Sequence, residues 1–157
     1  MLDQELDSFE YIDIKPKNYK SKEQLLNDLG EISTTLENIT NDWKERELAL
    51  KEIGSIAKGN QKKSDTLINY FNSKLCNYFE IQLLDLRTSV MKEACRIISL
   101  CAKEIGLLIE QGILQLLSQN CLFKIAGSAN KVISDSASKC ILNLIKYIHS
   151  LLTRIRK

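Results

Sequence analysis

The sequence has a single proline and only six glycines in 157 residues, so it has few of the residues that form turns. Aromatic residues make up 6% of the chain, and β-branched residues never alternate with polar ones for more than a few positions. These shortages argue against a β-sheet and favour long helices. Hydrophobic residues at 44% and charged residues at 27% are ordinary for a soluble globular chain, so we expect one domain with a sizeable core.

Residues that carry common catalytic and metal chemistry are also scarce. His149 is the only histidine, and the five cysteines are never closer than six positions apart. A zinc site and a disulfide framework are therefore poorly supported, and buried reduced thiols in a cytoplasmic protein are expected. The sequence has no glycine-rich phosphate loop and no G-x-S-x-G elbow, and His149 reads as a half-buried core residue. We predict no catalytic residue, no metal and no cofactor, so the chain is not expected to be an enzyme. The cysteines are Cys76, Cys95, Cys101, Cys121 and Cys140.

Long hydrophobic runs are missing as well. The first ten residues, MLDQELDSFE, are acidic and do not resemble a signal or transit peptide. The most apolar stretch, from Cys140 to Leu152, is interrupted by Asn143, Lys146 and His149. It is too short and too polar to span a bilayer.

The net charge of +2 conceals an asymmetry along the chain. Residues 1–41 hold nine acids and four bases, a balance of −5, whereas residues 42–157 hold eleven acids and eighteen bases, a balance of +7. A mildly basic body favours an acidic partner, although a scattered positive charge is also a common aid to solubility.

An internal repeat gives the strongest structural signal. Ala49 is followed by Ile53 and Ile56, and the same small-then-apolar spacing recurs 45 and then a further 43 residues along the chain. The second and third copies are Ala94, Ile98, Cys101 and Ala137, Ile141, Leu144. Offsets of this size are typical of HEAT-type repeats, and the spacing marks one face of a helix.

An earlier amphipathic helix precedes each copy, so the sequence predicts an all-α solenoid of about three helix hairpins. We expect hairpins over about 21–59, 64–106 and 107–149, a C-terminal helical extension, and an extended or loosely ordered segment over residues 1–20. Ser21 and Asp42 are candidate N-caps, and Gly59, Gly106 and Gly127 lie near expected helix ends. The three apolar stripes are Leu25, Leu26, Leu29, Ile32, Leu36, Ile39; Leu67, Ile68, Phe71, Leu75, Phe79; and Ile109, Ile113, Leu116, Leu117.

The loops within the hairpins should line one edge of the solenoid. Six positions before each core alanine stand Trp43, Thr88 and Lys131. Because two of these three residues are polar or charged, the register places Trp43 at the rim, and helix packing would spread the three over roughly 20 Å. The alternative is that Trp43 packs on its own repeat as a structural staple. Arg87, Lys92 and Lys44 are expected beside this row.

At these residues the sequence resembles a known family, the N-terminal TOG-type domain of CLASP proteins. The resemblance runs over roughly residues 9–150 through FEYIDIKPKNYKSKEQLLNDLGEI, NDWKERELALKEIGSI, DLRTSVMKEACRIISLCAKEIG and SANKVISDSASKCILNLI. Its most specific parts are D-W-x-x-R-x-x-A-L at Asp42 to Leu50 and D-L-R-[ST]-x-V-x-[KR]-E-A-C at Asp85 to Cys95.

The resemblance implies a microtubule-associated protein of the cytoskeleton and spindle whose loop edge contacts tubulin. In the family a tryptophan of the first loop reaches β-tubulin, and Trp43 matches it. Basic and polar residues of the later loops assist, and Arg87, Thr88 and Lys131 match these. With Lys44 and Lys92, they form the tubulin-binding set that we expect.

Two departures from the family pattern shape the remaining expectations. Family domains continue beyond the third repeat, whereas this sequence ends at Arg156-Lys157, so about the first half of such a domain is expected. The family also has a proline after the third pair where this chain reads IHSLLTRI, which predicts that the last helix runs on. Its end would present an apolar surface that needs a cap from self-association or further repeats. The residues of that surface are Ile148, Leu151, Leu152 and Ile155.

Two other functions remain open at this point. The chain could be a generic HEAT adaptor that binds a protein partner in its concave groove. The C-terminal segment, with Lys139, Lys146, Arg154 and Arg156 around an apolar stripe, could instead lie on an anionic membrane, although the same stripe is needed to pack the third repeat. Nucleic-acid binding is not expected, because no aromatic platform or dense basic stripe is present.

Overall fold

The computed structural model describes residues 9–60, 64–85 and 87–156, with side chains up to residue 149. These residues form helices and connecting loops with no strand among them, which confirms the all-α class. The helices are α2 (Lys22–Leu36), α3 (Trp43–Gly59), α4 (Asp65–Tyr70), α5 (Cys76–Leu83), α6 (Thr88–Ile105), α7 (Glu110–Leu117), α8 (Leu122–Ala126) and α9 (Lys131–Arg156). A π-helical turn, Phe71–Leu75, joins α4 to α5, and a 3-10 turn, Gly106–Ile109, precedes α7.

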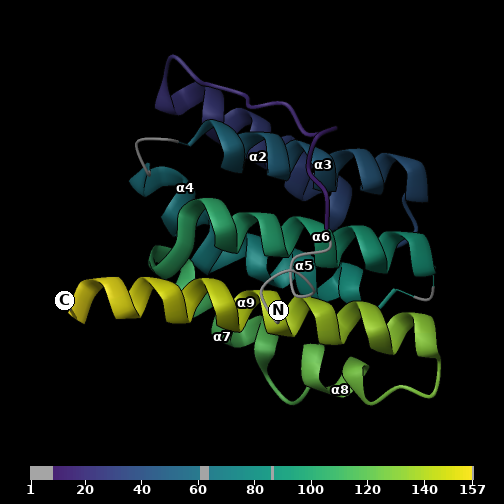
Figure 1. Ribbon diagram of the computed structural model, residues 1–157. Helices are drawn as coiled ribbons and strands as arrows, with labels where there is room; N and C mark the ends of the chain where they lie inside the picture. The colour runs from purple at the N-terminus through teal and green to yellow at the C-terminus, as the bar shows by residue number, and fades with distance from the viewer. Residues whose placement is uncertain (1–8, 61–63, 86, 157) are drawn as a thin grey trace.

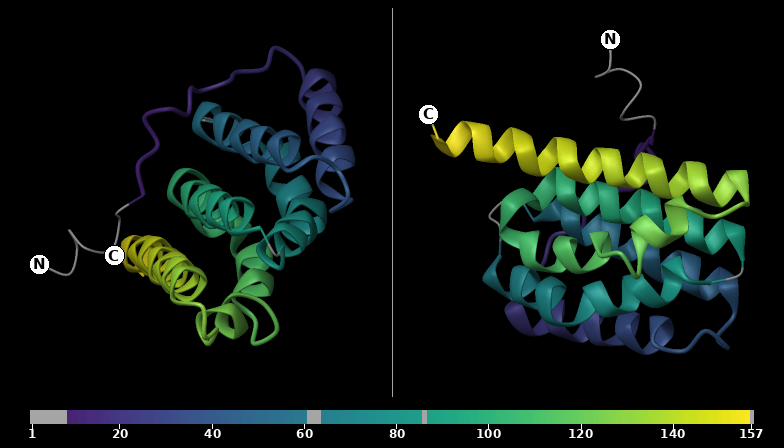
Figure 2. Two further views of the ribbon diagram at one scale, coloured as in Figure 1. Left: turned by 90° about the vertical axis from the view of Figure 1, so that its right-hand side faces the viewer. Right: turned by 90° about the horizontal axis from the view of Figure 1, so that it is seen from below.

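The helices pack in two layers. Helices α3, α6 and α9 lie side by side as one layer, and α2, α5 and α7 form the other (Figure 1; Figure 2, left). Each helix of the first layer follows a partner in the second, so the chain is a short α-solenoid of stacked helix hairpins, as predicted.

The repeated small residues are buried among the packed helices. Ala49 is 6% exposed, and Ala94 and Ala137 are fully buried. The residues four and seven positions after each alanine are at most 7% exposed. A methyl group at these positions lets the axes of α3, α6 and α9 approach closely.

The π-helical turn has a cause in the sequence. Leu67, Phe71, Leu75 and Phe79 recur every four residues, and all four are at most 1% exposed. On a regular α-helix of 3.6 residues per turn, a four-residue repeat drifts around the axis and would carry some of these side chains to solvent. One wider turn over Phe71–Leu75 corrects the drift and keeps the whole row in the core.

The third hairpin is less regular than the first two. Helix α6 ends at Ile105, and its C-cap Gly106 has a φ of 74°, a conformation that residues with a side chain rarely adopt. The short helix α8, which was not expected, lies between α7 and α9 and packs against α9. Helix α9 runs on for 26 residues, as the missing proline predicted.

Several expected core residues are exposed instead. Leu26 is 39% exposed because it lies beside the buried stripe of α2, and Ile39 is 58% exposed because α2 ends at Leu36. His149 and Ile145 are also exposed, so the prediction of a half-buried core histidine is wrong. These two residues are four positions apart and share a face of α9 that does not meet α6. The side chains of Leu151, Leu152 and Ile155 lie outside the described part of the chain.

Residues 9–20, which we call the N-terminal strap, have no helix and run across α3, α6 and α9 (Figure 1; Figure 2, left). Tyr11 and Ile14 are 7% and 3% exposed, so the strap belongs to the core. It covers the surface of α3, α6 and α9 that faces away from α2, α5 and α7, which we call the inner face.

Within the described residues, no helix is long and apolar enough to cross a bilayer.

Candidate protein-binding edge

Three loops within the hairpins meet at one edge of the solenoid. The edge faces the viewer in the left view of Figure 2, where the starts of α3, α6 and α9 lie in a row. Trp43, Thr88 and Lys131 are the first residues of these three helices, so the repeat register placed them at equivalent positions. Trp43 and Thr88 are partly buried and Lys131 is exposed.

The first loop is held by short polar side chains. Asn38 accepts hydrogen bonds at Oδ1 from the backbone N–H of Thr40 at 2.9 Å and from its hydroxyl at 2.8 Å. Asp42 is the N-cap of α3, and its carboxylate accepts the N–H of Lys44 at 3.4 Å. Asn41 donates from Nδ2 to the carbonyl of Thr35 at 2.9 Å, which ties the loop to the end of α2. The start of α3 is therefore fixed by local hydrogen bonds.

Trp43 lies between the core and the edge. Its ring packs against the hydrophobic core, and two cations lie over it. The guanidinium carbon of Arg87 is 4.8 Å from a ring centroid, and Nζ of Lys44 is 5.6 Å away. Both distances are in the cation–π range. The structure therefore brings Trp43, Lys44 and Arg87 together as one cationic aromatic cluster. The indole packs on its own repeat and is also partly exposed at the edge.

A buried arginine supports this cluster from behind. Arg46 is 4% exposed, and it donates from Nε to the carbonyl of Asn41 at 3.0 Å and from Nη1 to Oε1 of Gln82 at 2.8 Å. It also forms an ion pair with Asp85. Gln82 in turn donates from Nε2 to the carbonyl of Leu36 at 2.7 Å, so it satisfies an open carbonyl at the end of α2.

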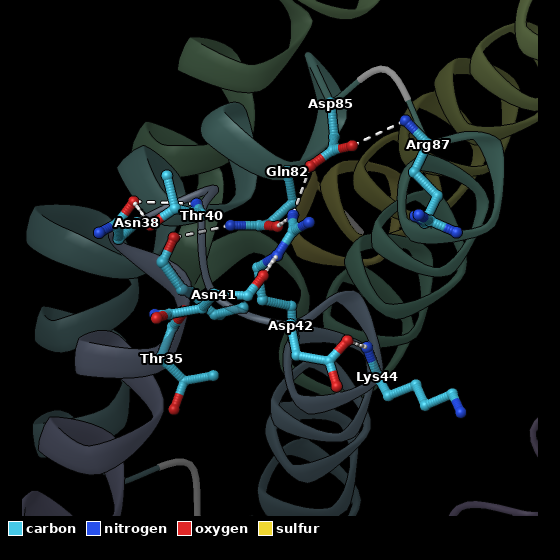
Figure 3. Close-up of polar contacts among 11 residues, drawn as sticks. Thr35, Asn38, Thr40, Asn41, Asp42, Lys44, Gln82, Asp85 and Arg87 are labelled. Carbon is cyan, nitrogen blue, oxygen red and sulfur yellow. Dashed lines mark hydrogen bonds and ion pairs between the residues drawn. The ribbon is translucent and has the colours of Figure 1, made fainter.

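Asp85 links the arginine to the second loop. One of its carboxylate oxygens pairs with Arg46, and the other accepts the backbone N–H of Arg87 at 2.7 Å (Figure 3). Arg46 of the first hairpin thus holds Asp85, and Asp85 holds the backbone of Arg87. The guanidinium of Arg87 lies over the ring of Trp43. The side chains of Lys44 and Arg87 lie on the same side of this network in Figure 3.

Beside the cluster is an open depression between the first and second loops. Its lining residues are Ile39, Arg46, Ile81, Leu84, Asp85 and Arg87. Ile39 and Leu84 are 58% and 51% exposed, so they present apolar surface beside the cluster. An apolar side chain of a partner could be buried there, next to the charges of Lys44 and Arg87.

The remaining predicted residues extend the edge. Thr88 directly follows Arg87, Lys92 is exposed one turn further along α6, and Lys131 begins α9 in the third hairpin. The structure thus joins three of the six predicted residues through contacts and places the other three along the same row of helix starts.

Sequence reasoning missed the residues that hold the edge in place. Arg46 and Asp85 are the arginine of D-W-x-x-R and the aspartate of D-L-R, so they are part of the two motifs that carry the resemblance. Gln82 lies outside both motifs and gave no signal. The sequence could not show that two residues 39 positions apart form one ion pair.

A comparison with models of protein families identifies the family of the chain. The family model described as CLASP N terminal matches residues 25–155, which is most of the chain. The chain belongs to the CLASP N-terminal family. A search of curated proteins found no significant match. The CLASP match begins inside α2, covers the rest of the three hairpins and includes every residue of the edge, and at the family level it assigns the chain to a microtubule-associated group.

Proposed function

We propose that this chain is a tubulin-binding module of a CLASP-like protein and that it regulates microtubule dynamics. Membership of the CLASP N-terminal family supports this function. The observation that carries the proposal is the cluster of Trp43, Lys44 and Arg87 at the start of the first two repeats. No catalytic role is proposed, and the expected location is the microtubule cytoskeleton, including the spindle.

The edge suits a partner that is acidic and partly apolar. Residues 42–157 carry a balance of +7, which would steer an acidic surface such as that of tubulin toward the chain. Trp43 would act as the anchor at the centre of the contact, because partly buried aromatic residues supply most of the energy at interfaces. Lys44, Arg87 and Lys131 would form the charged rim.

Co-pelleting with microtubules and sedimentation with soluble tubulin test the proposal. We expect Trp43→Ala to weaken binding about 30-fold, as loss of a hot spot does. Lys131→Glu should weaken it several-fold and mainly at low salt. Leu114→Ala and Lys74→Glu, which alter exposed residues of the other helix layer, are the matched controls and should bind like wild type. Equal binding by all five chains, or no binding by wild type, would contradict the proposal.

The alternative is a HEAT adaptor that holds a partner on the inner face of α3, α6 and α9. It predicts that binding is indifferent to Trp43 and sensitive to substitutions on the inner face. Trp43→Ala therefore tests the loop edge, and Arg96→Asp, which alters a residue of the inner face, tests the alternative.

A further inference from the structure

The N-terminal strap is bound to the inner face as a separate peptide would be. Its backbone is recognised directly, because Nζ of Lys58 donates to the carbonyl of Tyr11 at 2.6 Å and to that of Ile14 at 2.9 Å. The N–H of Lys17 donates to the carbonyl of Ser55 at 2.9 Å. These contacts fix an extended chain without the help of a sheet.

The side chains of the strap are recognised as well. Arg96 of α6 binds both oxygens of Asp13, at 2.8 and 3.0 Å, and it also donates to the carbonyl of Glu10 at 2.8 Å. A bidentate arginine–carboxylate pair of this kind is both strong and directional. The guanidinium is oriented from the other side by Glu93.

The aromatic residues of the strap lie under cations. Nζ of Lys139 on α9 is 4.2 Å from the ring centroid of Phe9, and Nζ of Lys103 on α6 is 5.4 Å from that of Tyr11. Phe9, Tyr11 and Asp13 thus lie at every second position of the strap, and a basic residue of the inner face meets each of them.

The apolar part of the contact is made by Ile14, which lies beside Gly54 of α3. Gly54 of α3 has no side chain, and an added Cβ would lie 3.0 Å from Ile97 and 3.4 Å from Ile14. Ile14 fills this gap between α3 and α6 and is 3% exposed. The inner face therefore selects an aliphatic residue directly after the carboxylate.

We infer that the inner face is a recognition groove for an extended peptide with the pattern aromatic-x-aromatic-x-Asp-aliphatic, and that the strap occupies it as a built-in competitor. The natural occupant in trans is a segment of a partner protein with this chemistry. It must displace the strap, whose effective concentration is on the order of millimolar because it belongs to the same chain. The groove lies on the inner face and not on the loop edge, so the inference does not depend on tubulin binding.

The first test uses a fluorescein-labelled peptide of residues 9–20, FEYIDIKPKNYK, and the full chain with its strap weakened by Asp13→Lys and Ile14→Ser. These substitutions leave every groove residue unchanged. We expect the peptide to bind the weakened chain at least ten-fold more tightly than wild type, by fluorescence anisotropy, because the internal competitor is lost. The reversed peptide KYNKPKIDIYEF has the same charge and composition, and it should bind neither chain. Equal affinity for the two chains, or equal binding of the two peptides, would overturn the inference.

A second test swaps the charges of Arg96 and Asp13. It applies if the weakened chain has lost its helical circular dichroism and is therefore unfolded. Arg96→Asp should speed hydrogen exchange of the Lys17 amide at least ten-fold, because the strap is repelled. Adding Asp13→Arg to Arg96→Asp should restore slow exchange. A double variant that exchanges as fast as the single one would show that Arg96 does not recognise this carboxylate, and the inference would fail.

Discussion

Arg46 is a residue at which one substitution should have a large effect on stability. Removing the guanidinium leaves the carboxylate of Asp85, whose side chain is 10% exposed, without its charge partner. Breaking a buried pair from one side costs about 3–5 kcal/mol. We therefore expect Arg46→Met to lower the free energy of unfolding by about that amount, measured by urea denaturation.

The matched comparison is a double-mutant cycle with Asp85→Leu. Because the double variant leaves no unpaired charge, it should be more stable than either single variant. Lys17→Met breaks the exposed pair with Asp28 and should cost no more than about 1 kcal/mol. Simple additivity of the two substitutions at positions 46 and 85 would speak against a coupled pair.

Asp13 offers a test by pH. The hydrogen bond from Arg96 holds the pKa of this carboxyl below its ordinary value of 3.8. Because the pKa in the folded state is depressed, the pair stabilises the strap above pH 4, and this contribution is lost as the pH falls through the folded pKa. Carbon-13 NMR titration of the Asp13 carboxyl should show the low pKa in wild type and a higher one in Arg96→Gln. An unchanged pKa in the variant would contradict the ion pair.

The position of a single residue could be predicted from the sequence where equivalent positions in the other repeats could be compared with it. Trp43 was placed at a helix start because Thr88 and Lys131 occupy the same position in later copies. It could not be decided from the sequence whether the indole is a staple or a surface, because the answer depends on Arg87, which covers it from another hairpin. Contacts between hairpins have no local signature.

At the scale of elements, the strap crosses α3 where only glycine fits. A Cβ on Gly59 would lie 2.0 Å from the carbonyl oxygen of Lys17, which belongs to the backbone and cannot simply rotate away. We expect Gly59→Ala to shift the strap, lower stability by roughly 1–3 kcal/mol as overpacking does, and speed hydrogen exchange of the Lys17 amide.

Gly30→Ala is the control for this substitution. Gly30 lies inside α2, and a Cβ there would meet nothing within 4 Å. The change should raise stability by about 0.5–1 kcal/mol through helix propensity. If Gly59→Ala were also stabilising, the close approach of the strap would be refuted.

The helix boundaries followed from the sequence more closely than the details within helices. Asp42 and Ser21 cap α3 and α2 as predicted, because N-caps are local. The apolar stripe from Leu67 to Phe79 was found, but its four-residue spacing was not read as a π-helical turn. The short helix α8 was missed because five residues are too few to show a period. The binding of the strap to the inner face was missed too, because an extended segment carries no periodic signal.

At the scale of the whole molecule, the fold class could be predicted because the repeats stack in a line and each repeat contacts only its neighbours. Each hairpin buries its stripe against the next, so a conserved offset between copies within one sequence already fixes the order of the layers. The candidate edge follows from that order. The groove on the inner face does not, since it depends on a segment outside the repeats that folds back over them.

Alkylation of the five cysteines can show the order in which the hairpins unfold. All five are free and at most 1% exposed, and burial raises the pKa of Cys101 and of Cys121 to about 12. Their thiols should therefore resist alkylation at pH 7.5 in the native state. In a linear array the terminal hairpin has fewer neighbours than the central one. At intermediate urea we expect Cys121 and Cys140 of the third hairpin to react with iodoacetamide before Cys95 of the second, as mass spectrometry of the labelled peptides would show. Equal labelling of these three thiols at every urea concentration would mean that the hairpins unfold as one cooperative unit, with interfaces too strong for the end to fray.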